Sequence, residues 1–304
     1  MLVRHVLNTV LAMLLVIVLT ALPLTKVLAQ SYWDWWYSDC EADFTTTVRP
    51  LTWQANQNNL QRIRIDIRFT QRTDSCVTEV LLFTDNYYYL SLNSDTDSVN
   101  SEIADRRRDV YPLYYVGGRI AWVVPIYRVR SLRLYAQLTS NEPIIAGDYR
   151  GHLNIAASSY GSIVSDEKVV NVDMEVPSIL SVSVQTSGNP ALSGGSGYYY
   201  VELGDMYEGK RVDWDLDVYT NTHYDVTVNS EYGGLRHKSD GTLIDYDILM
   251  DGQRFSASNG YTKRYINYSP LTTSSIPLAV EVGATDFKPA GEYVDYMVVT
   301  VSAR

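Results

Sequence analysis

Residues 289–304, "PAGEYVDYMVVTVSAR", have the pattern of one strand that reaches the last residue of the sequence. A Pro-Ala-Gly turn signal comes first, and from Tyr293 the residues alternate or run apolar, which is typical of a buried strand. The sequence predicts no further strand to pair with its far edge. Because a long apolar strand with an open edge promotes aggregation, we expect another element or another chain to cover it.

The same kind of pattern fills the rest of the chain. Between Gln30 and Arg304 no segment keeps a 3.6-residue apolar period with caps, whereas short period-2 runs recur between turn clusters. "RIRIDIRF" (Arg62 to Phe69) and "VDWDLDVY" (Val212 to Tyr219) alternate cleanly. Further strands are expected at Val77 to Phe83, Ser131 to Leu138, His152 to Ala156, Val169 to Val176, Ile179 to Val184, Asp225 to Val228 and Ile276 to Val282. The sequence therefore predicts an all-β fold of the sandwich type.

The two halves of the chain resemble each other. "NEPIIAGDYRGHLNIAA" (141–157) matches "ATDFKPAGEYVDYMVVTVSA" (284–303) around Ala-Gly-Asp/Glu-Tyr. "DVYPLYYVGGR" (109–119) aligns with "LIDYDILMDGQR" (243–254), and "IDIRFTQRTDSCVTEVLL" (65–82) with "VDWDLDVYTNTHYDVTVN" (212–229). We therefore predict a tandem of two β-sandwich units, an N-terminal domain (30–176) and a C-terminal domain (177–304).

The predicted tandem is unequal at its ends. After its Ala-Gly-Asp-Tyr strand, the first unit continues into "KVVNVDMEV" (168–176), a strand that can close its own sheet. The second unit stops after the corresponding strand. We expect the second sandwich to be incomplete and its missing strand to come from another molecule.

The N-terminus carries the three parts of a secretory signal peptide (1–29): Arg4 and His5, an apolar run from Val10 to Leu24, and a small-residue cleavage site ending at Ala29. The alternative, a membrane anchor, is disfavoured because the run is short and Lys26 interrupts its end. In an exported chain, Cys40 and Cys76 most simply form one disulfide within the first domain. The alternative, a metal pair, has no nearby His to complete it.

Composition and motifs exclude several kinds of function. A net charge of -10 argues against nucleic acid or anionic lipid as a partner. His152, His223 and His237 do not stand at metal-ligand spacing, and nucleophile-elbow, phosphate-loop and zincin motifs are missing. Asp213, Asp215 and Asp217 share one strand face, which we interpret as a solvated sheet face. We expect no enzyme, metal or cofactor; an exported carbohydrate-binding or hydrolytic sandwich is a further hypothesis.

Three loops of the first unit are expected at the end that points away from the second unit: Thr70 to Ser75, Gly117 to Tyr127 and Ser158 to Glu167. The middle loop contains a long apolar run, and Pro125 disfavours a central strand there. We interpret this run as an exposed hydrophobic finger; the alternative is a core strand with a bulge. The predicted surface-binding residues are Ile120, Trp122, Val123, Val124, Pro125, Ile126 and Tyr127, with Tyr160, Ile163 and Val164 from the neighbouring loop.

Several stretches resemble the spore coat protein U domain, the pilin unit of archaic (Csu-type) chaperone-usher pili. They are "VPSILSVSVQ" (176–185), "VYTNTHYDVTVNSEYGGL" (218–235), "IDYDILMDGQ" (244–253) and "PAGEYVDYMVVTVSA" (289–303). The resemblance covers residues 177–304 well and the first unit only loosely. The family's cysteine near the first pilin strand is absent, because Leu180 or Ser181 stands there.

The resemblance implies an incomplete immunoglobulin-like sandwich that lacks its last strand. A periplasmic pilus chaperone supplies that strand first, and the next pilin subunit replaces it by donor-strand exchange at the outer-membrane usher. The expected edge of the donor-strand groove is formed by Tyr293, Tyr296, Val298, Val299 and Val301.

A two-unit subunit of this family resembles the tip adhesin. It would be exported through the periplasm to the cell surface and would attach to an apolar or host surface in biofilm formation. The alternative is a structural shaft pilin or spore-coat subunit that donates residues Gln30 to Asp39.

Overall fold

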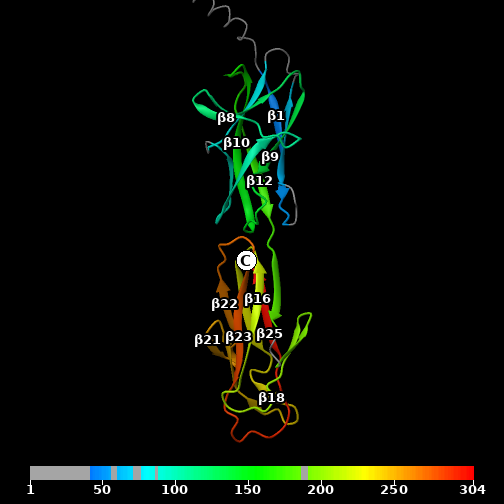
Figure 1. Cartoon of the computed structure of the whole chain (residues 1–304), viewed down its shortest axis with the longest axis vertical. Coiled ribbons are helices and arrows are strands. Elements are labelled where there is room, and N and C mark those ends of the chain that lie inside the picture. The colour runs from blue at the N-terminus through cyan, green and yellow to red at the C-terminus, as the bar shows by residue number, and fades with distance from the viewer. Residues whose placement is uncertain (1–41, 56–59, 71–76, 86–87, 186–190) are drawn as a thin grey trace, which may run out of the picture.

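A computed structural model of the chain describes residues 42–55, 60–70, 77–85, 88–185 and 191–304 (Figure 1). The predicted signal peptide, the pair Cys40 and Cys76, and the segment Gln30 to Asp39 lie outside these residues. Within the described ranges, no helix has the length and apolar character needed to cross a membrane.

The first half of the described chain, here called the N-terminal part, contains the strands that make up one connected 12-stranded sheet system. Its strands are β1 (Phe44–Arg49), β2 (Leu51–Thr52), β3 (Arg62–Phe69), β4 (Glu79–Phe83), β5 (Leu90–Asn93), β6 (Ser98–Ala104), β7 (Leu113–Val116), β8 (Arg119–Pro125), β9 (Ser131–Leu138), β10 (Gly147–Ser159), β11 (Ser162–Ile163) and β12 (Lys168–Val176).

The second half, the C-terminal part, contains four smaller sheets in the described residues. Its elements are β13 (Leu180–Gln185), β14 (Leu192–Gly195), β15 (Tyr198–Val201), β16 (Arg211–Thr220), β17 (Tyr224–Ser230), β18 (Leu235–His237), β19 (Leu243–Ile244), β20 (Tyr246–Met250), β21 (Gln253–Ser256), the 3-10 helix η1 (Ala257–Asn259), β22 (Tyr261–Tyr265), β23 (Thr272–Val282), β24 (Tyr293–Val294) and β25 (Met297–Ala303).

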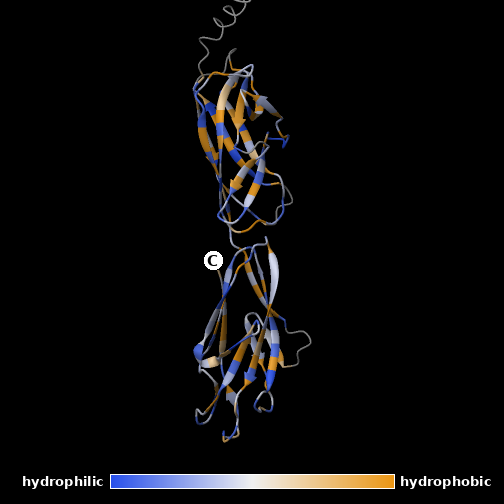
Figure 2. Cartoon of the chain, turned by 90° about the vertical axis from the view of Figure 1, so that its left-hand side faces the viewer, coloured by the Kyte–Doolittle hydropathy of each residue, from blue (hydrophilic) through white to orange (hydrophobic). Residues whose placement is uncertain are grey.

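The all-β prediction is confirmed, and period-2 patterning explains why these segments form strands. In β3, Ile63, Ile65 and Ile67 are buried while the intervening charged residues reach solvent. In β16 the buried side chains alternate with outward-facing aspartates, and Figure 2 shows this alternation of hydrophobic and hydrophilic residues along the strands. Such alternation places one face of each strand on a core and the other in water.

Two large, separate clusters of buried side chains form the main cores, and a third, small cluster of Leu81, Phe83, Ala121 and Ala156 belongs to the N-terminal part. One cluster draws its buried residues from β1 to β12, with Trp122, Tyr149 and Phe44 among the largest side chains, and the other draws them from the C-terminal part. Figure 1 shows the two parts stacked end to end along the long axis of the molecule. The division into two independent domains at residue 177 stays a prediction.

The two parts share one strand topology. In the N-terminal part the ladders run β1-β3-β9-β6 and β8-β4-β10, and in the C-terminal part they run β13-β16-β23-β20 and β22-β17-β25, with the corresponding strands in the same chain order. The strand β12 has no such counterpart among the described residues. β12 pairs with β10 in the N-terminal part, whereas no strand of the described C-terminal residues takes the equivalent place beside β25.

One of the predicted repeat matches does not occupy equivalent positions. The segment 109–119 contains β7, which pairs with β8 at the edge of its sheet. The segment 243–254 contains β20, which pairs with β23 and corresponds to β6. The shared Tyr and Gly residues of these segments therefore reflect similar hairpin turns and not the same strand.

Candidate strand-accepting slot and distal surface

β25 lies at the edge of its sheet and pairs antiparallel with β17, from Ser230 opposite Met297 to Tyr224 opposite Ala303. Its other edge has no ladder partner among the described residues. β13 is likewise the edge strand of the facing sheet and comes close to β25 without a ladder between them. The space between β13 and β25 is called the slot below.

Six apolar side chains line the slot, and they are only partly buried. The residues are Leu180, Val182 and Val184 from β13, and Met297, Val299 and Val301 from β25. Val182 is 43% exposed to solvent. The apolar row of β25 therefore faces the core side of the sandwich, and within the described part of the chain no strand lies beyond it to complete its burial.

In the N-terminal part, the place equivalent to the slot is occupied by a strand. There β12 covers the edge of β10 along nine residue pairs, and the four core-facing residues of β12 are all buried: Val170, Val172, Met174 and Val176. β12 runs antiparallel to β10 and parallel to β2. By the shared topology, a strand in the slot would run antiparallel to β25 and parallel to β13.

The predicted groove-edge residues fall into three places. Val299 and Val301 line the slot, whereas Tyr296 and Val298 are exposed on the outer face of the sheet. Tyr293 belongs to β24, which pairs with β18, and the centroid of its ring lies 4.8 Å from the centroid of the His237 ring. Sequence reasoning missed the slot residues of β13, although the alternating "LSVSVQ" pattern identified that segment as a strand.

Asp295, two residues before the first residue of β25, fixes where the strand begins. Its carboxylate accepts hydrogen bonds from the Tyr246 hydroxyl (2.7 Å), from the backbone N–H of Tyr232 (3.1 Å) and from the Ser230 hydroxyl. Burial and the neighbouring Asp295 carboxylate raise the pKa of Tyr246 above its ordinary value. This partly buried network ties the start of β25 to β17 and β20, so one rim of the slot has a fixed position.

The interpretation of residues 120–127 as an exposed finger is wrong for the larger part of the run. β8 pairs with β4 on one side and β7 on the other, and Trp122 retains only 1% exposure within the N-terminal core. Val124 and Ile126 are also buried there, while Ile120 and Val123 are half-buried. Pro125 is tolerated because it is the last residue of the strand.

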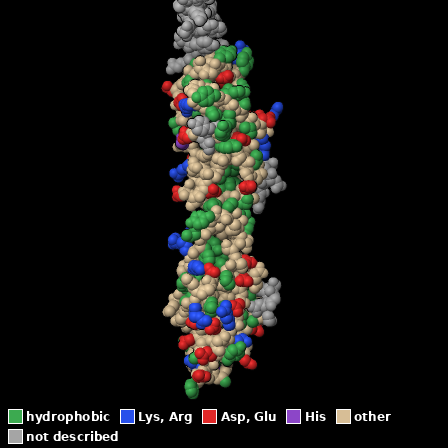
Figure 3. Space-filling view, turned by 60° about the vertical axis from the view of Figure 1, so that its left-hand side comes forward, with side chains coloured by type: hydrophobic (Ala, Val, Ile, Leu, Met, Phe, Trp, Pro, Cys, Tyr) green, Lys and Arg blue, Asp and Glu red, His purple; other side chains and the backbone are tan. Residues whose placement is uncertain are grey.

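Of the predicted surface residues, Tyr127, Tyr160 and Ile163 reach solvent together at one end of the molecule, and Pro125 is exposed as well. β10 runs from the junction between the parts to Ser159, so the turn at Tyr160 lies at the far end of the N-terminal part. Tyr127 is 75% exposed, Tyr160 is 74% exposed, and Ile163 is partly exposed. We call these three residues the distal surface; Figure 3 shows hydrophobic side chains reaching the surface at this upper end.

Hydrogen bonds fix the backbone that carries the distal surface. The backbone N–H of Tyr160 donates to the Thr78 hydroxyl (2.8 Å), and the N–H of Ile126, next to Tyr127, donates to the Thr78 carbonyl (2.8 Å). Val164 is half-buried, and its N–H donates to Ala157 in β10 (2.9 Å). Two loops distant in sequence are thus brought together by the start of β4.

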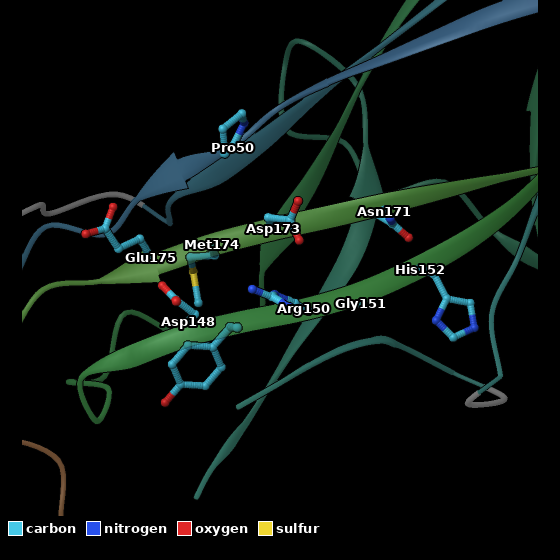
Figure 4. A pocket seen from close by; sticks show the side chains of 10 residues that line it. Pro50, Asp148, Arg150, Gly151, His152, Asn171, Asp173, Met174 and Glu175 are labelled. Carbon is cyan, nitrogen blue, oxygen red and sulfur yellow. The ribbon is translucent and has the colours of Figure 1, made fainter. Parts of the chain in front are cut away.

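A polar hollow of about 500 Å³ lies along β10 and β12 (Figure 4). Its lining includes cross-strand pairs of polar residues, among them Arg150 with Asp173, together with Met174 and Pro50. Gly151 lacks a side chain there because a Cβ would lie 2.6 Å from the carbonyl oxygen of Ser91. Packing against β5 thus explains the glycine, and we assign no binding site to this solvated sheet face. In the described residues, no cluster of His, Cys, Asp and Glu is arranged to hold a metal ion.

Comparison with known proteins gave matches to solved structures only; no family model and no curated protein matches the chain. A chain of the CsuC–CsuE chaperone-tip adhesion subunit complex of archaic Csu pili of Acinetobacter baumannii is 12% identical, with a TM-score of 0.34, over 84% of this chain and 99% of that chain. A mutant of the CFA/I enterotoxigenic Escherichia coli adhesin CfaE is 10% identical, with a TM-score of 0.37, over 86% and 88%.

The CssB subunit of enterotoxigenic Escherichia coli colonization factor CS6, complemented with a donor strand from CssA, is 13% identical, with a TM-score of 0.31. That match covers 43% of this chain and 97% of CssB. At these identities and TM-scores, none of the similarities assigns a function to the chain.

Proposed function

We propose that this chain is the tip subunit of a chaperone-usher pilus. Its C-terminal part accepts a β-strand from another protein in the slot, and its N-terminal part carries the distal surface with which the pilus attaches. The observation that supports the proposal is the contrast between the two parts. β12 covers the edge of β10, whereas no strand of the described residues covers the equivalent edge of β25, and the apolar row of β25 is only partly buried.

Strand addition suits this slot for two physical reasons. The open edge of β25 offers main-chain donors and acceptors to an extended segment, and the apolar residues of both rims offer burial to alternate side chains of that segment. The proposed donors are a periplasmic pilus chaperone before assembly and the N-terminal segment of the next pilin in the fibre, delivered at the outer-membrane usher.

The distal surface is the proposed attachment site. Tyr127 and Tyr160 combine large, rigid rings with a polar tip, and their backbones are hydrogen bonded to Thr78. The proposed ligand is an apolar surface, abiotic or on a host, and the attachment would serve biofilm formation.

The experiment that tests the slot is hydrogen exchange of residues 297–303. In the isolated mature chain these amides are expected to exchange fast and the protein to polymerise or precipitate. Co-expression with the pilus chaperone from the same cells is expected to give a one-to-one complex in which they exchange slowly. A stable free monomer with slow exchange in 297–303 would refute the slot.

The position in the pilus needs a separate experiment. A tip subunit donates no strand, so deletion of residues 30–39 is expected to leave its assembly onto the pilus unchanged. Loss of polymerisation in this deletion would show a shaft subunit that donates its N-terminal segment.

A further inference from the structure

Asn221 lies in the turn between β16 and β17, is fully buried, and uses its whole side-chain amide. Its Nδ2 donates to the carbonyl oxygens of Ile144 (3.2 Å) and Pro177 (3.1 Å). Its Oδ1 accepts from the backbone N–H of Ile179 (2.7 Å). The carbonyl of Asn221 also accepts from the N–H of Ala146 (2.9 Å).

These partners belong to different pieces of the molecule. Ile144 and Ala146 precede β10 in the N-terminal part, while Pro177 and Ile179 form the connection between β12 and β13. If the two parts moved apart, these carbonyl and N–H groups would lose their hydrogen-bond partners. A buried polar group without a partner costs free energy, so the hydrogen bonds oppose this movement. One side chain therefore holds the orientation of the N-terminal part and the path of the connection.

The same turn also holds both rims of the slot at their junction ends. β13 begins at Leu180 opposite Thr220, and β25 ends at Ala303 opposite Tyr224. The Thr222 hydroxyl donates to the carbonyl of Arg304 (2.8 Å), and the N–H of Arg304 donates to the carbonyl of His223 (2.9 Å). Figure 1 shows the C-terminus at this junction.

We propose that Asn221 is a positioning residue that couples occupancy of the slot to the orientation of the N-terminal part. A strand in the slot fixes both rims, the rims fix the turn 220–223, and Asn221 passes this constraint to the loop 144–146. The inference rests on the proposed strand acceptance. Coupling between two sites is reciprocal, so a loosened junction also weakens acceptance of the strand. In the assembled fibre, the distal surface would thereby be held in line with the pilus axis.

The test uses the mature chain extended after Arg304 by a short flexible linker and a second copy of the β12 sequence "KVVNVDMEV". The tether gives this donor strand a high effective concentration at the slot. Hydrogen exchange is followed in residues 297–303, which report slot filling, and in the N-H of Ala146, which lies in the N-terminal part. Filling the slot is expected to slow exchange at Ala146 about tenfold, within the usual range of coupling between sites.

Asn221→Ala in the extended chain is expected to abolish the added protection at Ala146 while residues 297–303 remain protected. Asn267→Ala is the matched control. The side-chain amide of Asn267 donates to the carbonyl of Thr220 (3.4 Å), and its backbone N–H donates to the imidazole of His223, so both hydrogen bonds stay within the C-terminal part. This variant is expected to keep the Ala146 response.

The outcomes separate the inference from the proposed function. If residues 297–303 become protected but Ala146 does not respond, or responds equally in Asn221→Ala, the coupling is refuted and strand acceptance stands. If residues 297–303 stay unprotected in the extended wild-type chain, strand acceptance fails and the coupling fails with it.

Discussion

The hydroxyl of Tyr246 donates a hydrogen bond of 2.7 Å to Oδ2 of Asp295, and so joins β20 to the residue two positions before β25. The Tyr246 side chain is buried, and its pKa is raised by that burial and by the Asp295 carboxylate. The start of the slot's rim therefore depends on a partly buried polar contact between segments that are far apart in sequence.

Tyr246→Phe is expected to lower the free energy of unfolding by about 1–2 kcal/mol at pH 7, because it leaves the half-buried Asp295 carboxylate with one hydrogen bond fewer. Urea unfolding measures this loss. The pKa of Tyr246 is higher in the folded than in the unfolded chain, so its contribution is present below pH 10 and is lost as the pH rises further. The difference between wild type and variant is expected to shrink from pH 10 to pH 11, and a constant difference would contradict the assignment.

Val299→Asp is expected to prevent strand acceptance, because it places a carboxylate in the apolar row that a donor strand would bury. The neighbouring Val298→Asp is the control, since Val298 is 57% exposed on the outer face of the same strand. Co-purification with the pilus chaperone is the measurement. Loss with Val299→Asp and retention with Val298→Asp is the expected result; equal retention would place the donor elsewhere.

Trp122→Ala is expected to lower the free energy of unfolding by about 3–5 kcal/mol, because it leaves a large cavity in the N-terminal core. Tyr127→Ala, five residues along the same stretch, is expected to change it by less than about 0.5 kcal/mol, because the ring is exposed. Chemical denaturation followed by circular dichroism compares the two. A small change in the free energy of unfolding of Trp122→Ala would contradict the burial of Trp122 and support the alternative of an exposed loop.

A double variant, Tyr127→Ser and Tyr160→Ser, is expected to reduce adsorption of the protein to polystyrene beads several-fold without loss of stability. Tyr114→Ser and Tyr115→Ser form the matched control, because these tyrosines are also exposed but lie on the edge strand β7. Equal adsorption of the two double variants would refute the distal surface as the attachment site.

Gly151→Ala is expected to destabilise the N-terminal part by about 1–3 kcal/mol, because its Cβ would lie 2.6 Å from the Ser91 carbonyl oxygen and 2.8 Å from Leu92 Cδ2. Gly195→Ala is the control, since no heavy atom lies within 4 Å of its added Cβ. Thermal unfolding distinguishes the two, and tolerance of Gly151→Ala would show that β5 can move away from β10.

The strands themselves were predictable from local pattern. Arg62 to Phe69 and Ser131 to Leu138 coincide with β3 and β9, because alternation of apolar and polar residues in the sequence is the alternation of inner and outer faces in a sheet. The Ala-Gly-Asp/Glu-Tyr repeat likewise identified the strands that became β10 and β25 as equivalents.

Candidate sites were predicted less well, because exposure is a property of the packed structure. The apolar run around Trp122 looks the same whether it forms a buried strand or an exposed loop, and only pairing of β8 with both β4 and β7 buried it. The slot residues of β13 carried a strand pattern, but their shared face with β25 depends on how two sheets meet.

The sequence by itself determined the all-β class, the periodic strands and the likeness of the two halves, because these follow from local side-chain alternation. It also predicted that residues 168–176 close the sheet of the first unit and that the last strand keeps an open edge. Only the tertiary structure decided which side chains form the two rims of the slot, because their shared face depends on how β13 and β25 meet. It also brought Asn221 to Ile144, and Asp295 to Tyr246, across separations that no local pattern encodes. The physical reason is that contacts between distant segments are set by the packing of whole sheets.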